Sequence, residues 1–490
     1  MSAHRFLAVD LGAGGGRVME GRLEGGRLKL EEIRRFQNEM MEVEGHLHWN
    51  IEYLQDQVLC GLEDCASRGP LEGIGIDTWG VDFGLLGPDG RLLGPPFCYR
   101  DHRTDGAIED FFRIVPRERV FALTGIQVLT INSLFQLYSM VRDGSSQIKR
   151  ASDILFIPDI FNHLLSGIKA TEFTYATTTQ LYNPAKGGWE DGLFSAMGLS
   201  TDLMQNIVDP GTVLGPVRSD ICRGIDNAGT VVIAPGTHDT ASAVAAVPAR
   251  GDDWAFISCG TWSPMGVEVK EPVLSRRAME LNFTNEGGVG GGFRLLKNIT
   301  GMWLLQQCMK EWDKGTSLDY PTLMDMARAA EPFRSIIDPD DSLFLSPSSM
   351  TGAVGKFCRD SGQPEPSAPG EFVRCILESI ALRYRQVLGE IREVSPGPVN
   401  RLHIVGGGSR NDLLCRFTAD ATGLPVTAGP AEATALGNIM VQAMSLGCGD
   451  SIDELRRVVS RSFEIVHYEP QDHDTWAQPY RRFLLLGSEK

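Results

Sequence analysis

Short apolar runs that end in glycine-rich polar turns recur along the chain, and they predict buried strands with loops at their ends. Three such pairs of run and turn stand out: 6–9 with 10–17, 254–258 with 259–263, and 402–405 with 406–411. Extended character resumes after the first turn, at 18–20, whereas a helical apolar period follows the third, from Leu413 toward Ala421. Apolar positions at 302–312 and 372–388 also have helical spacing. The pattern predicts an α/β protein whose glycine turns bring backbone N–H groups close to a ligand.

The first turn, Asp10-Leu11-Gly12-Ala13-Gly14-Gly15-Gly16-Arg17, has the composition of a phosphate-binding loop. An acidic residue at a strand end, here Asp10, can hold hydrated Mg²⁺, and Arg17 can offset phosphate charge. A plain tight hairpin also favours glycine, and the Lys and Ser/Thr of a Walker loop are missing. Both interpretations stay open on these residues alone.

The other two turns have related chemistry. The second turn, Cys259-Gly260-Thr261-Trp262-Ser263, follows a strand and again has a small residue, a glycine and a hydroxyl in this order. It indicates either a duplicated unit, in which two such turns bind one polyphosphate, or a coincidental hairpin. The turn Gly406-Gly407-Gly408 precedes a helix, so it can admit the base or ribose of a nucleotide close to the main chain.

One carboxylate lies in a turn rich in Gly, Thr and Ala, at 234–243, between the apolar run 231–233 and an apolar helix. This residue, Asp239, is therefore expected where a strand ends and a helix begins. An Asp at such a point either caps the helix or serves as a base in a site held by a rigid wall.

Further polar residues allow two interpretations each. Asp77 and Asp82, in the strand-like run 76–83, either bind ligand hydroxyls or anchor a turn. Arg100 and Asp101 form either a solvated charge cluster or a hydroxyl-binding pair. The acidic segment 338–341 lacks the glycine and distal glutamate of an EF-hand, so we expect a solvent-exposed loop there.

Length, charge and cysteine content limit the class of protein. A chain of 490 residues is too long for one typical core and predicts two domains, 1–247 and 248–490, joined near 247–253. A net charge of −17 argues against a nucleic-acid partner. No stretch reaches the length of a membrane span, which is about 18 apolar residues. Residues 1–5 do not begin a secretion signal. We therefore expect a cytoplasmic protein without a membrane partner. Ten cysteines without a Cys-x-x-Cys pair indicate reduced thiols.

These segments, in this order, resemble the FGGY carbohydrate kinases over nearly the whole chain. The motifs that carry the resemblance are 9–13 with 16–17, 75–83, 99–101 with 103–104, 158–159, 176–180, 238–244, 260–263, 285–288, 297–299 with 303–306, and 403–408. The segments Asp77-Thr78-Trp79-Gly80-Val81-Asp82-Phe83 and Asn285-Glu286-Gly287-Gly288 are similar to the branch of the family that acts on L-rhamnulose.

The resemblance implies an α/β fold of two actin-like ATPase (ribonuclease H-like) domains with an interdomain active-site cleft. The N-terminal domain would hold the sugar and phosphate loop, and the C-terminal domain would bind the nucleotide. Carried over residue by residue, Asp239 would be the proton acceptor, and Gly80, His238, Thr240 and Asn298 would bind the substrate. The nucleotide would contact Ala13, Gly14, Gly15, Gly16, Arg17, Thr261, Gln306 and Gly407, and Asp10 would organise the Mg²⁺ that accompanies ATP.

The activity implied is transfer of phosphate from ATP to the 1-hydroxyl of L-rhamnulose in L-rhamnose catabolism, with a related ketose such as L-fuculose as the alternative. An actin-like ATPase that uses water as acceptor and a sugar-sensing regulator are other classes to consider. The family usually has Ser or Thr hydroxyls where this chain has Gly14 and Gly15, so two phosphate donors are replaced by backbone. The sequence does not indicate an oligomeric state.

Overall fold

The structure is a computed structural model that describes residues 4–221, 229–313, 318–345 and 347–486. The chain forms two compact units that are not contiguous in sequence. The first contains Met1–Pro248, Glu268–Leu295 and Ala433–Phe463, and the second contains Ala249–Val267, Leu296–Glu432 and Glu464–Lys490. The predicted domains 1–247 and 248–490 stay a prediction; the compact units differ from them chiefly in the segments 268–295 and 433–463.

A six-stranded sheet forms the centre of the first unit, in the order β13-β14-β6-β1-β2-β3. Its strands are β1 (His4–Gly12), β2 (Gly15–Glu24), β3 (Arg27–Gln37), β6 (Gly73–Thr78), β13 (Thr212–Pro216) and β14 (Val231–Ala234). β1 is buried from Phe6 to Asp10 because it lies between two neighbours, β2 antiparallel and β6 parallel to it. This pairing places Asp10 beside both Asp77 of β6 and Arg17 of β2.

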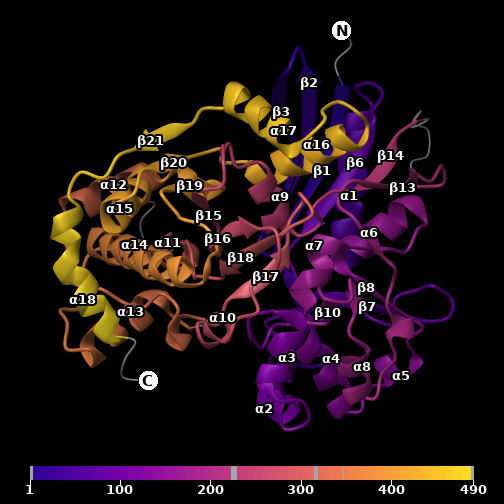
Figure 1. Cartoon of the computed structure of the whole chain (residues 1–490), viewed down its shortest axis with the longest axis horizontal. Coiled ribbons are helices and arrows are strands. Elements are labelled where there is room, and N and C mark those ends of the chain that lie inside the picture. The colour runs from indigo at the N-terminus through magenta and orange to yellow at the C-terminus, as the bar shows by residue number, and fades with distance from the viewer. Residues whose placement is uncertain (1–3, 222–228, 314–317, 346, 487–490) are drawn as a thin grey trace. The chain divides into compact units, whose positions relative to one another are not determined.

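Helices pack on this sheet through close approaches. They include α1 (Ile51–Ala66), α6 (Ile157–Ser166), α9 (Asp239–Ala245), α16 (Ala433–Ser445) and α17 (Ile452–Ser462). In Figure 1 the yellow helix α16 lies beside α9 and over β1 and β6. Gln442 of α16 donates to the Leu7 carbonyl at 2.9 Å, and a Cβ on Gly437 would lie 1.7 Å from the Ser242 carbonyl oxygen of α9. Glycine at 437 therefore sets the distance between the two helices.

A second apolar core of the first unit contains Phe83, Phe111, Phe135, Phe156 and Phe194. The helices around it are α2 (Ala107–Phe112), α3 (Arg117–Thr124), α4 (Ser133–Arg142), α5 (Ser146–Arg150), α7 (Phe173–Ala176) and α8 (Asp191–Ala196). The short strands of this unit are β4 (Met40–Val43), β5 (His46–Trp49), β7 (Phe83–Leu86), β8 (Asp153–Phe156), β9 (Thr171–Glu172), β10 (Tyr182–Asn183), β11 (Gly188–Trp189), β12 (Ile207–Val208) and β17 (Thr284–Gly287). Helix α10 (Arg276–Glu280) precedes β17, and β18 (Phe293–Lys297) follows it.

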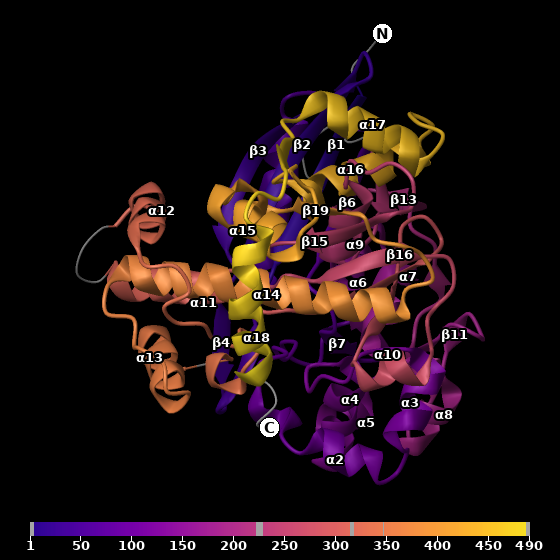
Figure 2. The same ribbon diagram turned by 60° about the vertical axis from the view of Figure 1, so that its left-hand side comes forward.

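The second unit is built on the parallel strands β15 (Trp254–Ser258), β19 (Arg401–Val405) and β20 (Val426–Ala428). β16 (Met265–Val269) pairs with β15, and β21 (Val466–Tyr468) pairs with β20, both antiparallel. Its helices are α11 (Trp303–Trp312), α12 (Tyr320–Ala329), α13 (Met350–Asp360), α14 (Pro369–Val394), α15 (Asp412–Thr422) and α18 (Ala477–Leu486). Figure 2 shows α14 as the long orange helix against which α18 packs.

The predicted strands at 6–9, 231–233, 254–258 and 402–405 and the predicted helices at 302–312 and 372–388 are all confirmed. None of the helices in the described parts of the chain combines the length and apolar character that a membrane span needs.

Candidate active site

Asp239 is the first residue of α9, directly after the turn that leaves β14. His238 is the N-cap, and no side chain there makes a capping hydrogen bond, so Asp239 is not the cap of this helix. Two contacts hold the turn: Thr78 at the end of β6 donates its N–H to the Thr237 carbonyl at 2.9 Å, and the Ser242 hydroxyl donates to the Gly236 carbonyl at 2.7 Å. The Asp239 side chain is 31% exposed and can meet a ligand.

The two carboxylate oxygens of Asp239 have different surroundings. Oδ1 accepts from the Thr240 backbone N–H at 2.5 Å and from the Thr240 hydroxyl at 3.0 Å. His238 Nε2 lies 3.5 Å from the same oxygen. Among the described residues no donor is recorded for Oδ2. The oxygen Oδ2 is therefore the one available to a proton from outside.

The His238 imidazole is held from its other side by a buried ion pair. Arg294 of β18 places Nη2 3.2 Å from His238 Nδ1 and 3.3 Å from Glu286 Oε2. Glu286 Oε2 lies 3.4 Å from the same Nδ1. Burial lowers the pKa of Arg294, against the charges of the carboxylates around it.

Glu172 organises the turn before Asp239. Its buried carboxylate accepts from the N–H and the hydroxyl of Thr237, both at 2.9 Å, and from the N–H and the hydroxyl of Thr174. The Gly287 N–H donates to the Thr177 hydroxyl at 2.7 Å, which ties β17 to the segment after α7. The turn is thus fixed by residues far from it in the sequence.

Gly80 leaves space beside His238. A Cβ on this glycine would lie 3.4 Å from both His238 Nε2 and the Thr178 hydroxyl oxygen. The first unit therefore brings together four of the predicted site residues: Gly80, His238, Asp239 and Thr240.

Asp82 anchors the local structure. Its carboxylate is fully buried and accepts from the indole N–H of Trp49 at 2.6 Å, the indole of Trp79 at 3.0 Å and the Gln136 amide at 2.8 Å. Burial raises its pKa to about 6. These contacts favour the turn-anchor interpretation, since both oxygens of Asp82 accept hydrogen bonds from the surrounding fold.

The structure also shows what Arg100 and Asp101 contact. Asp101 is buried and accepts from the backbone N–H groups of Leu47 and Arg103, so it too serves the local fold. The Arg100 guanidinium lies over the Tyr99 ring, 5.1 Å from its centre.

The glycine-rich loop of the first unit is a tight hairpin turn. Gly12 pairs with Gly15, which leaves Ala13 and Gly14 at the tip. A Cβ on Gly16 would lie 2.3 Å from the Phe36 ring, so a side chain there would displace this ring, whereas no described atom lies within 4 Å of a Cβ on Gly14. Gly16 thus allows Phe36 to pack against the strand, and the tip of the hairpin is open.

Asp10 and Arg17, to which the sequence assigns metal and phosphate, form an ion pair with each other at 2.8 Å. Beside Asp10, Asp77 is wholly buried; its Oδ2 accepts from the Asn438 amide at 2.6 Å, while no hydrogen bond to Oδ1 is found in the described ranges. Burial, and then the charge of Asp10, raises the Asp77 pKa well above its usual value. Two adjacent carboxylates, one with a buried oxygen that has no partner in the described ranges, have the ligand chemistry of a divalent cation site, because Mg²⁺ is usually bound through one or two carboxylates plus phosphate and water.

The second unit carries the remaining predicted residues. The Thr261 hydroxyl donates to Gln306 Oε1 at 3.4 Å, so these two lie together. Gly407 lies in a turn beside Gly408. The Gly408 N–H donates to the Cys259 carbonyl at 2.8 Å and so holds this turn against the residue that follows β15. A Cβ on Gly408 would lie 2.1 Å from Cys259 Sγ, which explains glycine there. Asn298 directly follows β18 and is partly buried.

The acidic segment 338–341 differs from the expected solvent loop. Asp340 Oδ2 accepts from Arg383 Nε at 2.8 Å, and its Oδ1 accepts from the Thr300 N–H at 2.7 Å. Asp338 is largely removed from solvent, and burial raises its pKa. The prediction of a solvent-exposed segment was wrong because Asp340 has partners 40 or more residues away in the sequence.

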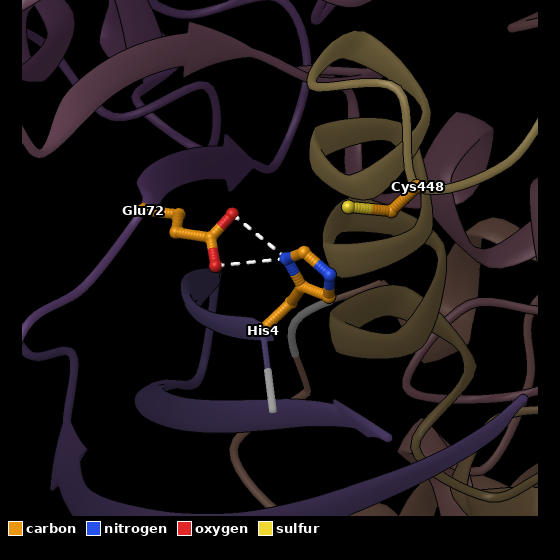
Figure 3. A group of neighbouring side chains, drawn as sticks. All are labelled: His4, Glu72 and Cys448. Carbon is orange, nitrogen blue, oxygen red and sulfur yellow. Dashed lines mark hydrogen bonds and ion pairs between the residues drawn. The ribbon is translucent and has the colours of Figure 1, made fainter. Parts of the chain in front are cut away.

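Within the described part of the chain, two other groups of side chains consist of residue types that can ligate a metal. Figure 3 shows the first, where His4 Nδ1 lies 2.9 and 3.0 Å from the two Glu72 oxygens, with Cys448 nearby. The second is His46, Asp101 and His102. The first includes no predicted site residue, and the second includes only Asp101, one of the two residues considered for hydroxyl binding. Nine cysteines are free, and Cys222, the tenth, lies outside the described residues.

A cavity of about 740 Å³ lies in the second unit, lined in part by Phe333, Arg374 and Trp476. Arg374 already donates to three backbone carbonyls and to Glu378, and none of the predicted site residues lines the cavity. We assign it no role in the predicted chemistry.

Comparison with known proteins identifies the class. Residues 7–246 match the N-terminal domain, and residues 255–446 the C-terminal domain, of the FGGY family of carbohydrate kinases. The chain belongs to this family. It is 48% identical over 479 residues to the rhamnulokinase of Bacteroides thetaiotaomicron, with 98% of each chain covered. It is 40% identical over 490 residues to the rhamnulokinase of Pectobacterium carotovorum, with 99% of this chain and 97% of the relative covered.

Solved structures show the same fold. Gluconate kinase from Lactobacillus acidophilus superposes with a TM-score of 0.79 at 15% identity, covering 100% of this chain and 98% of the other. Xylulose kinase from Rhodospirillum rubrum gives a TM-score of 0.79 at 17% identity, with 99% of each chain covered. The predicted fold of a two-domain α/β sugar kinase is confirmed.

Proposed function

We propose that this carbohydrate kinase transfers the terminal phosphoryl group of ATP to the 1-hydroxyl of L-rhamnulose, giving L-rhamnulose 1-phosphate and ADP in L-rhamnose catabolism. Similarity to rhamnulokinases over 98% of the chain supports the choice of substrate. The observation that carries the chemistry is the asymmetry of Asp239, whose Oδ1 accepts from Thr240 while no described residue donates to its Oδ2. L-Fuculose is the alternative acceptor, because one or two pocket contacts decide between such ketoses.

Asp239 is the proposed general base. Its Oδ2 takes the proton of the sugar hydroxyl while the bond from that hydroxyl oxygen to the terminal phosphorus forms and the phosphorus–oxygen bond to ADP breaks. Donors on Oδ1 hold the carboxylate in one orientation, so its free oxygen need not reorganise during the reaction. General-base catalysis of this kind is typically worth about 10²–10⁴-fold in rate.

The proposed sugar contacts are Gly80, His238, Thr240 and Asn298. Gly80 contributes space, since a side chain there would meet His238 Nε2. His238 and Thr240 flank the base on the chain and contribute polar groups for sugar hydroxyls.

For the nucleotide we propose contacts from Ala13 to Arg17 at the hairpin tip and from Thr261, Gln306 and Gly407 in the second unit. Mg²⁺ bound with ATP supplies positive charge to the phosphate oxygens, and Asp10 with Asp77 would hold it. Arg17 is paired with Asp10, so phosphate and carboxylate share this guanidinium when the nucleotide binds. ATP as co-substrate favours the cytoplasm as the place of action.

The test is ADP release measured with Mg·ATP, first without sugar and then with L-rhamnulose, L-fuculose or L-ribulose at equal concentration. The proposal predicts turnover that requires sugar and a kcat/KM highest for L-rhamnulose, with a phosphate monoester at carbon 1 in the product by ³¹P–¹H correlation. Turnover of equal rate without sugar would identify an ATPase instead. A preference for L-fuculose would transfer the proposal to the alternative ketose.

A further inference from the structure

Outside the residues that the family resemblance assigns, Arg294 makes the most specific contact with the site. The side chain is fully buried on β18, donates Nε to the Gly287 carbonyl at 2.8 Å, and directs Nη2 at His238 Nδ1 at 3.2 Å. A guanidinium that meets an imidazole nitrogen at hydrogen-bond distance has a chemical consequence, because Arg has five donors and no acceptor. The nitrogen that faces it must accept.

We infer that Arg294 is a positioning residue that fixes His238 as the tautomer with its proton on Nε2, and so directs a hydrogen-bond donor at the base and at the ketose. In a neutral imidazole one nitrogen carries the proton and the other accepts, and the partner of one nitrogen decides the state of the other. With Nδ1 accepting from Arg294, the proton is on Nε2. The inference about the ketose rests on the proposed function, whereas the tautomer does not.

The proton on Nε2 faces two places that matter for the reaction, the Asp239 carboxylate and the space beside Gly80. Nε2 lies 3.5 Å from Asp239 Oδ1, which already accepts from the N–H and the hydroxyl of Thr240. A proton on Nε2 therefore faces this carboxylate oxygen, where a lone pair on Nε2 would repel it. The space that Gly80 leaves borders the same Nε2, so a sugar hydroxyl bound there meets the proton and not a lone pair.

Glu286 has a different part in this arrangement. Its carboxylate lies 3.3 Å from Arg294 Nη2 and compensates a charge that is costly to bury. Glu286 Oε2 also lies 3.4 Å from His238 Nδ1 and could accept from that nitrogen only if the proton were on Nδ1. Hydrogen-bond geometry is met by the contact from Arg294 to Nδ1, and this favours the Nε2–H form.

The tautomer can be read directly by ¹⁵N–¹H correlation of the histidine rings in the full chain without ligand, because protonated and unprotonated ring nitrogens resonate far apart. The chain has nine histidines, and His238→Gln assigns the signals of this one by their loss. We expect a protonated Nε2 and an unprotonated Nδ1 for His238. In Arg294→Met the proton should move to Nδ1, toward Glu286, in at least part of the molecules. In Glu286→Gln the Nε2–H form should persist.

Arg5→Met serves as the matched control. Arg5 also forms a buried pair with a glutamate, Glu20, at 2.8 Å, but at the other end of β1 from Asp10. This variant removes a guanidinium from another Arg–Glu pair, far from His238 in the sheet, and should leave the His238 signals unchanged. If Arg294→Met does not fold, the wild-type spectrum and the spectrum of Glu286→Gln still decide the inference.

Kinetics test the consequence for the reaction. In Arg294→Met we expect kcat/KM for L-rhamnulose to fall about 3- to 10-fold, the range of one neutral hydrogen bond, with KM for ATP unchanged. A wild-type His238 protonated on Nδ1, or a tautomer that is the same in Arg294→Met, would overturn the inference. Absence of sugar phosphorylation with the Nε2–H signal present would refute the proposed function and leave the tautomer assignment standing.

Discussion

At the scale of single residues, the sequence predicts those site residues whose position is determined by the segments directly before and after them in the chain. Asp239 is of this kind, because the strand before it and the helix after it are both readable as apolar patterns, and its place at the start of α9 follows. Arg294 and Glu286 were not predicted to have a role. They reach His238 from a hairpin about 50 residues further along the chain, and only the segment Asn285-Glu286-Gly287-Gly288 gave a signal, as part of the family resemblance.

The space next to His238 leads to a prediction for Gly80→Ala. The added methyl group would lie 3.4 Å from His238 Nε2 and from the Thr178 hydroxyl, in the place proposed for the ketose. We expect KM for L-rhamnulose to rise about 10- to 100-fold, as one misplaced methyl group costs about 1–3 kcal/mol in a fitted pocket. KM for ATP should stay the same.

Steady-state kinetics with each substrate varied in turn measure this effect. Gly188→Ala is the control, since no atom lies within 4 Å of a Cβ at that position and its backbone suits any residue. An unaltered KM for the ketose in Gly80→Ala would remove this glycine from the sugar site.

At the scale of helices and strands, most elements that border the site were predictable. The strands β1, β14, β15 and β19 were recognisable because each is a short apolar run that ends in glycine or another turn residue. The contact between α9 and α16 was not, because it joins residues about 190 apart and depends on one glycine, Gly437, that no local pattern marks. The same limit explains the acidic segment 338–341, whose partners Thr300 and Arg383 are remote in sequence.

Gly437→Ala tests how closely α16 must approach the helix that begins with Asp239. A Cβ would lie 1.7 Å from the Ser242 carbonyl oxygen, so the helices must separate, and we expect a loss of about 1–3 kcal/mol in the free energy of unfolding. Gly389→Ala is the matched control in α14, where no atom lies within 4 Å of the new Cβ. There the higher helix propensity of alanine should stabilise by about 1 kcal/mol.

Urea unfolding followed by circular dichroism compares the two variants. Equal stabilisation by both substitutions would contradict the close approach of α9 and α16.

At the scale of the whole chain, the sequence predicts two α/β domains of the sugar-kinase type, and the family models and solved structures agree with that fold. It does not predict that the compact units are discontinuous. The segments 268–295 and 433–463 belong to the first unit because their contacts, such as those of Arg294 with His238 and of Gln442 with Leu7, lie with residues before 248. Such pairings follow from tertiary packing and not from any local periodicity.

Removal of the metal tests the proposed roles of Asp10 and Asp77. A ligand present at about 100 times its Kd stabilises the folded chain by about 2.7 kcal/mol. We expect ADP with Mg²⁺ to raise the Tm clearly more than ADP with a chelator, because the two adjacent carboxylates need a cation before phosphate can approach. Asp10→Asn should remove most of this difference.

Differential scanning calorimetry at fixed ADP concentration provides the comparison. A Tm shift that is equal with and without Mg²⁺ would show that these carboxylates do not hold the metal with the nucleotide.

The central claim is that Asp239 Oδ2 removes the proton from the sugar hydroxyl, and Asp239→Asn tests it most directly, because the amide keeps the shape of the side chain and loses its basicity. With L-rhamnulose and Mg·ATP both saturating, the account predicts that kcat for ADP release falls about 10²- to 10⁴-fold, while KM for the sugar changes little. A kcat close to that of the unaltered protein would contradict it.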